Sequence, residues 1–403
     1  MAAKVEIKNK TGIGALDAII KASSQKFGKD LSSEDYGDYV PFSSGSLSLD
    51  LALYIGGIPT GRIIEILGEN SSNKTSFCLS FMARKQQSRV ENNARLRAIG
   101  TPEALAEVHE KRDLILDLEH SLTRSFIQGF GIDMDQTIWK RCDSAEEALQ
   151  ISLDYVKSGA IDIVIIDSVD AMQNKKQQAR QVGENDVGGI SKDMNFAVRQ
   201  IAKLSAEYMT TYLFINQIKM NPGKMFGSPE TTPGGRALEY YASLRLKCMT
   251  RQPCPDLPRA TTMRIQIKKS RCGPDYTEIV YVPFVHGTGV AELLDVQSVA
   301  KDFKLLRNSA GQTKVRWNPD DEDCWEPLLP DIEKGKDAAQ RALSEKPWLL
   351  AKLRALCLYA GGVTTAATLE EIKAMGPPVG PAEELSEVVE EPAEMTNDAP
   401  AGS

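Results

Sequence analysis

Residues 62–84 read RIIEILGENSSNKTSFCLSFMAR, and this stretch decides how the rest of the chain is interpreted. An apolar strand-like run, RIIEI, leads into a polar loop, and an apolar run with helical spacing follows the loop. A strand, a loop that begins with glycine and ends in Lys-Thr, and a helix are the order that a phosphate-binding loop (P-loop) requires. The backbone N–H groups of such a loop, with the positive end of the helix, suit a polyphosphate.

The predicted nucleotide site is one continuous segment. Its residues are Gly68, Glu69, Asn70, Ser71, Ser72, Asn73, Lys74, Thr75 and Ser76. Lys74 is expected to pair with the β- and γ-phosphates of ATP, and the Thr75 hydroxyl to ligate Mg²⁺. Asn73 stands where the motif has glycine; Asn tolerates left-handed backbone best among the other residues, but its side chain takes up space near the phosphates. The motif therefore supports ATP binding better than hydrolysis, and taken alone it also fits an ordinary polar loop.

Two further strand-like runs deliver carboxylates to the same predicted sheet edge. The run IDIVIIDSV (161–169) ends its apolar part in Asp167, which is placed to hold the water shell of Mg²⁺ beside Thr75, unless it is an ordinary strand-terminal Asp. The run DLILDLEHS (113–121) supplies Glu119, which is predicted to orient and deprotonate the attacking water. Asp117 and His120 are interpreted as structural.

The stretch LFINQIKMNPGKMFGSPETTPGGRALEYYASLRL (213–246) reads as a strand that opens into a glycine-rich loop. Lys219 and Arg236, with Phe226 between them, suit a sugar-phosphate chain whose bases remain readable. Gln217 at the strand tip is predicted to detect the γ-phosphate and pass its presence to the loop, as a nucleotide switch does. By composition alone, an ordinary mobile surface loop is equally compatible.

The whole chain limits the class of protein. Its 403 residues exceed a single core, and no apolar run approaches the about 20 residues that cross a bilayer. The amino terminus lacks the apolar segment of a secretory signal, so a cytoplasmic location is expected. Seven scattered cysteines and three histidines predict reduced thiols and no structural metal. The net charge of −7 equals the charge of the seven acidic residues after Lys373, so the remainder is neutral and compatible with local DNA-binding surfaces.

Strand patterns that alternate with helical patterns between residues 61 and 290 predict an α/β fold with a mainly parallel, twisted sheet. RIQIKK and EIVYVPFV add an antiparallel pair, and the polar residues 86–110 are interpreted as a surface excursion. The expected organisation is an amino-terminal helical arm (1–40), an ATPase core (41–290), a small α+β carboxy-terminal domain (291–375) and a disordered acidic tail (376–403), either regulatory or merely solubilising.

With these stretches in view, the chain resembles the RecA recombinases over roughly residues 10 to 350. The similarity rests on FSSGSLSLDLALYIGGIPTGRIIEILGE, LDLEHS, IVIIDSV and the 213–246 stretch, in family order. It implies a RecA-type P-loop ATPase core, ATP with Mg²⁺ as cofactors, and a homo-oligomeric filament on single-stranded DNA that pairs with double-stranded DNA and exchanges strands. It also implies possible single-strand-binding and mediator proteins as partners, and no membrane.

The resemblance assigns roles to further residues. It supports those given above to Lys74, Thr75, Glu119, Asp167 and Gln217, and it implies that Phe126 stacks on adenine. Lys269 and Arg271 match cations that reach the nucleotide of the adjacent subunit. The first DNA-binding loop corresponds to about 176–190. The implied DNA contacts are Lys192, Arg199, Lys219, Pro222, Gly223, Phe226, Gly234, Gly235 and Arg236.

Three departures from the family pattern concern activity and not fold. Asn73 replaces glycine, Thr123 stands where an adenine-side Asp is usual, and Glu239 replaces a cation between subunits. Asn73 leaves open a filament-forming DNA-binding protein with little ATP turnover as an alternative to the recombinase, and a RecA-core helicase is a further alternative. The MFGSPETTPGG loop and the amino-terminal arm argue against the helicase, whereas DNA-stimulated hydrolysis separates the other two.

Overall fold

The computed structural model describes residues 40–172, 189–220, 230–234, 236–249, 252–254, 260–273, 278–309, 312–328, 338–363 and 366–377, with only the backbone for 189–193, 220 and 338. The chain divides into two compact units, the first comprising residues up to Glu292 with 363–365, and the second comprising 293–362 and the residues from 366 onward. The predicted arm, except Val40, and the tail beyond residue 377 lie outside the described residues, as does most of the predicted first DNA loop.

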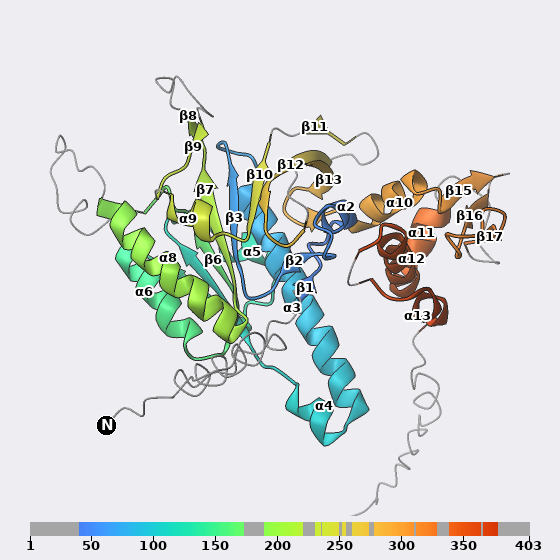
Figure 1. The fold of residues 1–403 in the computed structure, drawn as a ribbon, viewed down its shortest axis with the longest axis horizontal. Helices are drawn as coiled ribbons and strands as arrows, with labels where there is room; N and C mark the ends of the chain where they lie inside the picture. The colour runs from blue at the N-terminus through green and yellow to red at the C-terminus, as the bar shows by residue number, and fades with distance from the viewer. Residues whose placement is uncertain are drawn as a thin grey trace, which may run out of the picture. The chain divides into compact units, whose positions relative to one another are not determined.

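The first unit is built on a ten-stranded sheet within the described residues (Figure 1). Six neighbouring strands are parallel: β10 (Leu244–Cys248), β3 (Ile63–Gly68), β7 (Thr211–Gln217), β6 (Ile161–Asp167), β4 (Arg112–Asp117) and β5 (Thr137–Arg141). Beyond β10 the pairing is antiparallel, through β12 (Ala260–Ser270), β13 (Ile279–Val285) and β14 (Gly289–Val290), with β11 (Gln252–Pro253) beside β12. The predicted mainly parallel sheet and the antiparallel β12–β13 pair are confirmed.

Helices cover both faces of this sheet, which is why its central strands are apolar without alternation. The helices are α2 (Leu47–Ala52), α3 (Lys74–Ile99), α4 (Pro102–Ala106), α5 (Arg124–Gly129), α6 (Ala145–Val156), α8 (Gly189–Tyr208) and α9 (Ala237–Tyr241). In β3, Ile63 packs in the core beneath α6 and α8, whereas Ile64 packs on the opposite side with Phe77 of α3. Figure 1 shows α6 and α8 together on one side of the sheet and α3 on the other.

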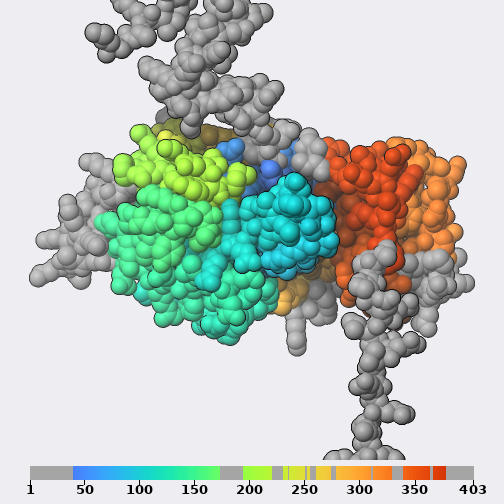
Figure 2. Space-filling model, turned by 90° about the horizontal axis from the view of Figure 1, so that it is seen from below, coloured from blue at the N-terminus to red at the C-terminus, as the bar shows by residue number. Residues whose placement is uncertain are grey.

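Helix α3 is longer than the sequence had indicated. Residues 86–99, predicted as a surface excursion, continue the helix to Ile99, and only a short α4 separates it from β4. Figure 2 shows this extension, in cyan, on the surface of the first unit. Its buried face is largely polar, which hid the helical period: Arg89 forms ion pairs with Asp113 at 3.1 Å and Asp162 at 2.8 Å.

Two short strand pairs complete the first unit: β1 (Pro41–Phe42) with β2 (Ile58–Pro59), and β8 (Lys219–Met220) with β9 (Glu230–Thr231). The β8–β9 pair flanks residues 221–229, the centre of the glycine-rich loop that is predicted to bind DNA and is called the second DNA loop below. The stem of that loop is therefore held directly beyond the end of β7.

The second unit mixes helices with a small antiparallel sheet. Its elements are α10 (Glu292–Asp302), β15 (Leu306–Ser309), β16 (Gln312–Val315), β17 (Glu326–Pro327), α11 (Ala338–Glu345), α12 (Pro347–Ala360) and α13 (Leu369–Ala374). Thr368 begins α13 with a capping box in which its hydroxyl and the Glu371 carboxylate satisfy each other's backbone N–H groups. In the parts of the chain that the structure describes, we find no helix with the length and hydropathy to cross a membrane.

Candidate functional site: a nucleotide site at the carboxyl edge of the sheet

The P-loop connects β3 to α3 and folds back on one carbonyl group. The Glu69 carbonyl accepts hydrogen bonds from Ser72 Oγ at 2.8 Å and from Lys74 Nζ at 2.6 Å. Ser71 and Asn73 both have left-handed backbone, with φ of 59° and 62°. Such alternation turns successive N–H groups toward one side, which is the geometry of an anion-binding nest. Burial lowers the pKa of Lys74, and the acidic groups around it only partly oppose this.

Gly68 and Asn73 show why the loop needs these residue types. A Cβ at Gly68 would lie 2.5 Å from both the Cys248 carbonyl oxygen and Ser72 Oγ, so only glycine allows the loop to approach β10 this closely. Asn73, at φ 62° and ψ 24°, adopts the conformation that Asn tolerates better than other side chains do. The substitution of glycine by Asn73 is thus accommodated by the backbone.

Asp167 and Thr75, predicted to hold Mg²⁺, lie in contact. Thr75 Oγ1 donates to Asp167 Oδ2 at 2.8 Å. Burial, reinforced by the charges of Glu119 and Asp117, raises the pKa of Asp167 to about 7, against the effects of Thr75 and Lys74. The other carboxylate oxygen, Oδ1, is buried without a hydrogen-bond partner among the described residues. A buried carboxylate oxygen beside a hydroxyl suits a hard divalent cation, so these residues fit Mg²⁺.

Glu119 lies next to this pair, just past the end of β4. In the β4–β6 register Asp117 is opposite Asp167, and Glu119 Oε1 accepts a hydrogen bond from Ser168 Oγ at 2.5 Å. Asp117, in contrast, is buried and accepts the N–H groups of Ser121 and Leu122, each at 3.3 Å. The side chain of Asp117 therefore shapes the turn after β4, whereas Glu119 is the carboxylate presented at the sheet edge.

Gln217 ends β7 directly opposite Gly68 of the P-loop. Its backbone N–H donates to Asn216 Oδ1 at 3.0 Å. Phe126 on α5 is 38% exposed and packs edge to face with Phe130, so part of its side chain is accessible. Thr123, the residue in place of the usual Asp, caps α5 by accepting the N–H of Phe126.

Lys269 and Arg271 gather at the end of the short helix α9. Lys269 Nζ donates to the carbonyls of Glu239 at 2.6 Å and Tyr240 at 3.1 Å, and Arg271 Nη2 donates to Tyr240 at 2.7 Å. Cations there satisfy carbonyls that have no partner within the helix. Burial and the neighbouring Arg271 and Arg245 lower the pKa of Lys269 to about 8.

The predicted DNA contacts are only partly described. Lys219 forms an ion pair with Asp170 at 2.5 Å, and Arg199 and Arg236 are exposed. Gly234 has φ 82°, and a Cβ there would meet Val169 at 2.8 Å, so the loop end packs against the segment after β6. The side chain of Lys192 and the whole of Pro222, Gly223, Phe226 and Gly235 lie outside the described residues.

Sequence reasoning missed a buried polar cluster beside this site, formed by Glu65, Asn216 and Arg245. Glu65 is fully buried in β3 and contacts both other side chains. The available signal was a charged residue in the middle of RIIEI, because buried charges in strands are rare unless they are paired.

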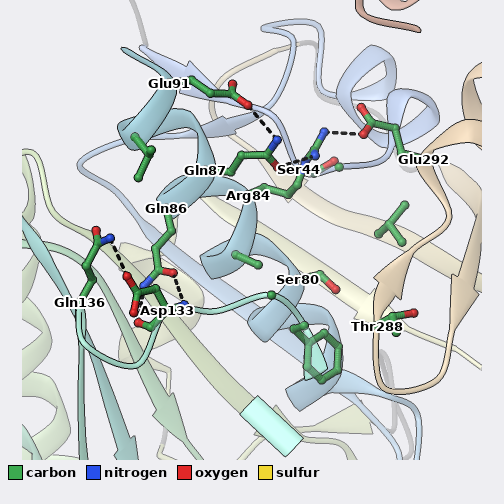
Figure 3. Close-up of a pocket in the computed structure, with 16 residues that line it drawn as sticks. Ser44, Ser80, Arg84, Gln86, Gln87, Glu91, Asp133, Gln136, Thr288 and Glu292 are labelled. Atoms are coloured by element: carbon green, nitrogen blue, oxygen red, sulfur yellow. Dashed lines mark hydrogen bonds and ion pairs between the residues drawn. The ribbon is translucent and has the colours of Figure 1, made fainter. Parts of the chain in front are cut away.

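A separate pocket of about 640 Å³ lies along α3 (Figure 3). Its wall includes Arg84, which pairs with Glu292 at 2.6 Å and donates to Gln87 at 2.9 Å. The described residues that line it include none of the predicted nucleotide or DNA residues. This pocket therefore contributes nothing to the nucleotide site.

The P-loop between β3 and α3, with carboxylates from β4 and β6 at the same sheet edge, defines a P-loop nucleotide-binding protein. A family model described as the RecA N-terminal domain matches residues 14–291. The chain belongs to the RecA family. It is similar to the proteins called Protein RecA of Bdellovibrio bacteriovorus (31% identical over 363 residues, 88% of this chain and 87% of the relative) and Clostridium novyi (34% over 308 residues, 75% and 81%). The protein of the same name from Rubrobacter xylanophilus is 35% identical over 292 residues, 70% and 78% of the two chains.

Proteins of this family act in ATP-dependent homologous recombination and DNA strand exchange. Membership implies a DNA-dependent ATPase that uses ATP, typically with Mg²⁺. The family therefore agrees with the nucleotide site that the geometry defines.

Proposed function

We propose that this chain assembles on single-stranded DNA with ATP and Mg²⁺, pairs it with homologous duplex DNA and hydrolyses ATP as strands exchange. The observation that carries the proposal is the contact between Thr75 and Asp167 beside the P-loop, with Glu119 at the same edge. These groups come from three separate chain segments, and phosphoryl transfer needs them together.

Each residue of the nucleotide site has a role that follows from its position. Lys74 leaves the Glu69 carbonyl, which it contacts in this structure, to pair with the β- and γ-phosphates. Thr75 and Asp167 would hold Mg²⁺, which neutralises charge on the phosphates. Glu119 orients and deprotonates the attacking water, and the Ser168 hydroxyl holds its carboxylate in place.

The remaining roles concern the neighbouring subunit and the DNA. Lys269 and Arg271 at the surface of one subunit reach the nucleotide of the next, and Phe126 stacks on adenine. Gln217, opposite Gly68, detects the γ-phosphate and passes the signal through β8 to the second DNA loop.

Strand exchange between a circular single strand and homologous linear duplex tests the proposal. With ATP and Mg²⁺ we expect joint molecules and displaced strand, and none without nucleotide. The Lys74→Ala variant is the matched control, because it removes the phosphate-binding ammonium from an otherwise intact loop. Exchange that proceeds equally in the variant, or a wild-type protein that binds ATP and DNA without pairing homologous strands, would overturn the proposal.

A further inference from the structure

The carboxylate of Glu65 joins three strands at the point where the nucleotide site meets the predicted DNA loop. Glu65 is fully buried in β3, between β7 and β10. Its Oε1 accepts from Asn216 Nδ2 at 2.9 Å, and its Oε2 accepts from Arg245 Nε at 2.6 Å. A buried charge persists only when it is paired and hydrogen-bonded, and here both oxygens have a partner.

On one side the cluster contacts Gln217, the predicted switch residue, and Pro233, near the end of the predicted DNA loop. Asn216 Oδ1 accepts the backbone N–H of Gln217, and Asn216 Nδ2 also donates to the Pro233 carbonyl at 3.2 Å. Pro233 stands where the predicted DNA loop returns, next to Gly234. One buried amide therefore fixes the γ-phosphate-detecting residue and the far end of the loop to the same carboxylate.

On the other side the cluster reaches the two cations at α9. Arg245 Nη1 donates to Glu239 Oε1 at 3.1 Å, and the carbonyl of Glu239 is one of the two that hold Lys269. Glu239 is the residue that replaces a cation in the family pattern, so this chain has an ion pair where that pattern places a positive charge. The side chain of Arg245 is only 12% exposed, which shields its pair with Glu65 from solvent.

We infer that Glu65 is a positioning residue that, with Asn216 and Arg245, makes the end of β7, the return of the DNA loop and the carboxyl end of α9 move as one body. The inference rests on the proposed function and deepens it. ATP at the P-loop then affects single-stranded DNA binding and the placement of Lys269 together, because all three segments share one carboxylate. Without the pair, each segment would settle independently, and nucleotide and DNA would bind with less mutual effect.

The measured quantity is the coupling factor, defined as the ratio of the single-stranded DNA Kd without nucleotide to the Kd with a non-hydrolysable ATP analogue. Coupling between two sites typically amounts to 5- to 150-fold. For Glu65→Gln, which keeps size and polarity but removes the charge, we expect the coupling factor to fall about tenfold. The affinity of the analogue in the absence of DNA should remain that of the wild type, because Glu65 does not line the P-loop.

Two further variants separate positioning from simple loss of stability. Asp113→Asn neutralises another fully buried carboxylate of the same sheet, paired with Arg89 and distant in register from the P-loop edge. It should lower Tm as Glu65→Gln does and leave the coupling factor unchanged. Glu239 is 55% exposed, so Glu239→Gln should disturb packing little, and it should reduce the coupling factor by a smaller amount.

A double-mutant cycle completes the test. Because Glu65 and Arg245 act as a pair, the Glu65→Gln and Arg245→Gln double variant should lose no more coupling than the worse single variant. Wild-type coupling in Glu65→Gln, or equal losses in Asp113→Asn, would overturn the inference. If the wild-type protein bound single-stranded DNA with the same Kd with and without the analogue, the proposed function itself would be refuted. Failure of the inference and failure of the proposed function are therefore distinguishable.

Discussion

Substitutions at position 73 test how the backbone of the P-loop controls nucleotide binding. Asn73 is left-handed, with φ 62° and ψ 24°, and immediately precedes α3. That conformation costs an ordinary L-residue about 1–2 kcal/mol, costs glycine nothing and costs Asn less than most. If the residue at position 73 disfavours the left-handed conformation, the P-loop adopts another geometry when no nucleotide is bound. The conformational energy of the left-handed state then lowers the affinity for the phosphates.

The expected affinities for ATP follow this order. Asn73→Gly should bind as tightly as the wild type or up to about fivefold tighter. Asn73→Val should bind about 5- to 30-fold more weakly, since a β-branched residue bears the full penalty. Because glycine also frees the space beside the phosphates, Asn73→Gly should raise single-strand-stimulated ATP turnover. The wild-type rate measured in the same assay decides between an active ATPase and a filament protein with little turnover.

The assay is titration with a fluorescent ATP analogue without DNA, followed by steady-state hydrolysis with single-stranded DNA. Gly131→Asn is the matched control, because Gly131 has φ 81° and open space around its Cβ position. It should lower Tm slightly and leave nucleotide affinity unchanged. If Asn73→Val bound ATP as tightly as the wild type, the claim that left-handed backbone at position 73 controls nucleotide affinity would be refuted. Unchanged turnover in Asn73→Gly would show that the Asn side chain is fully accommodated.

Three other outcomes are expected. Glu119→Gln should bind ATP and DNA and form filaments but lose hydrolysis, because the amide cannot take a proton; normal hydrolysis would remove Glu119 from this role. The pKa of Lys269 is lowered to about 8, so its ammonium is lost as pH rises from 7 to 9. Hydrolysis by the wild type should therefore fall in that pH window. The Lys269→Arg variant stays charged throughout and should keep its rate. Parallel pH–rate profiles for the two proteins would contradict this. Single-stranded DNA binding should weaken steeply with salt, and Lys219→Ala should reduce the slope of log K against log salt by about 0.7; an unchanged slope would mean that Lys219 remains with Asp170 and makes no phosphate contact.

Local features of the site were predictable from the sequence. Asn73 tolerates left-handed backbone because of its own side chain, so its conformation could be predicted without tertiary knowledge. Asp167 and Glu119 could be placed together because the carboxyl ends of parallel strands share one edge of a sheet. The contact between Thr75 and Asp167 follows from that arrangement once β6 and the P-loop are recognised.

Other features depend on pairings between distant segments, which periodicity does not reveal. The extension of α3 was missed because its buried side includes Arg89, which is held by acidic residues of β4 and β6 and not by an apolar core. Glu65 signalled a buried partner, but Asn216 and Arg245 are 151 and 180 residues away along the chain. Likewise, nothing in IKKSRC indicates that Lys269 rests on the carbonyls of α9.

The most direct test of the whole account is the binding of the purified chain to a labelled single-stranded oligonucleotide by fluorescence anisotropy. A non-hydrolysable ATP analogue with Mg²⁺ should tighten binding at least about tenfold and produce cooperative coating of the strand. Equal affinity with and without the analogue would contradict the claim that nucleotide bound at the P-loop controls the affinity for single-stranded DNA.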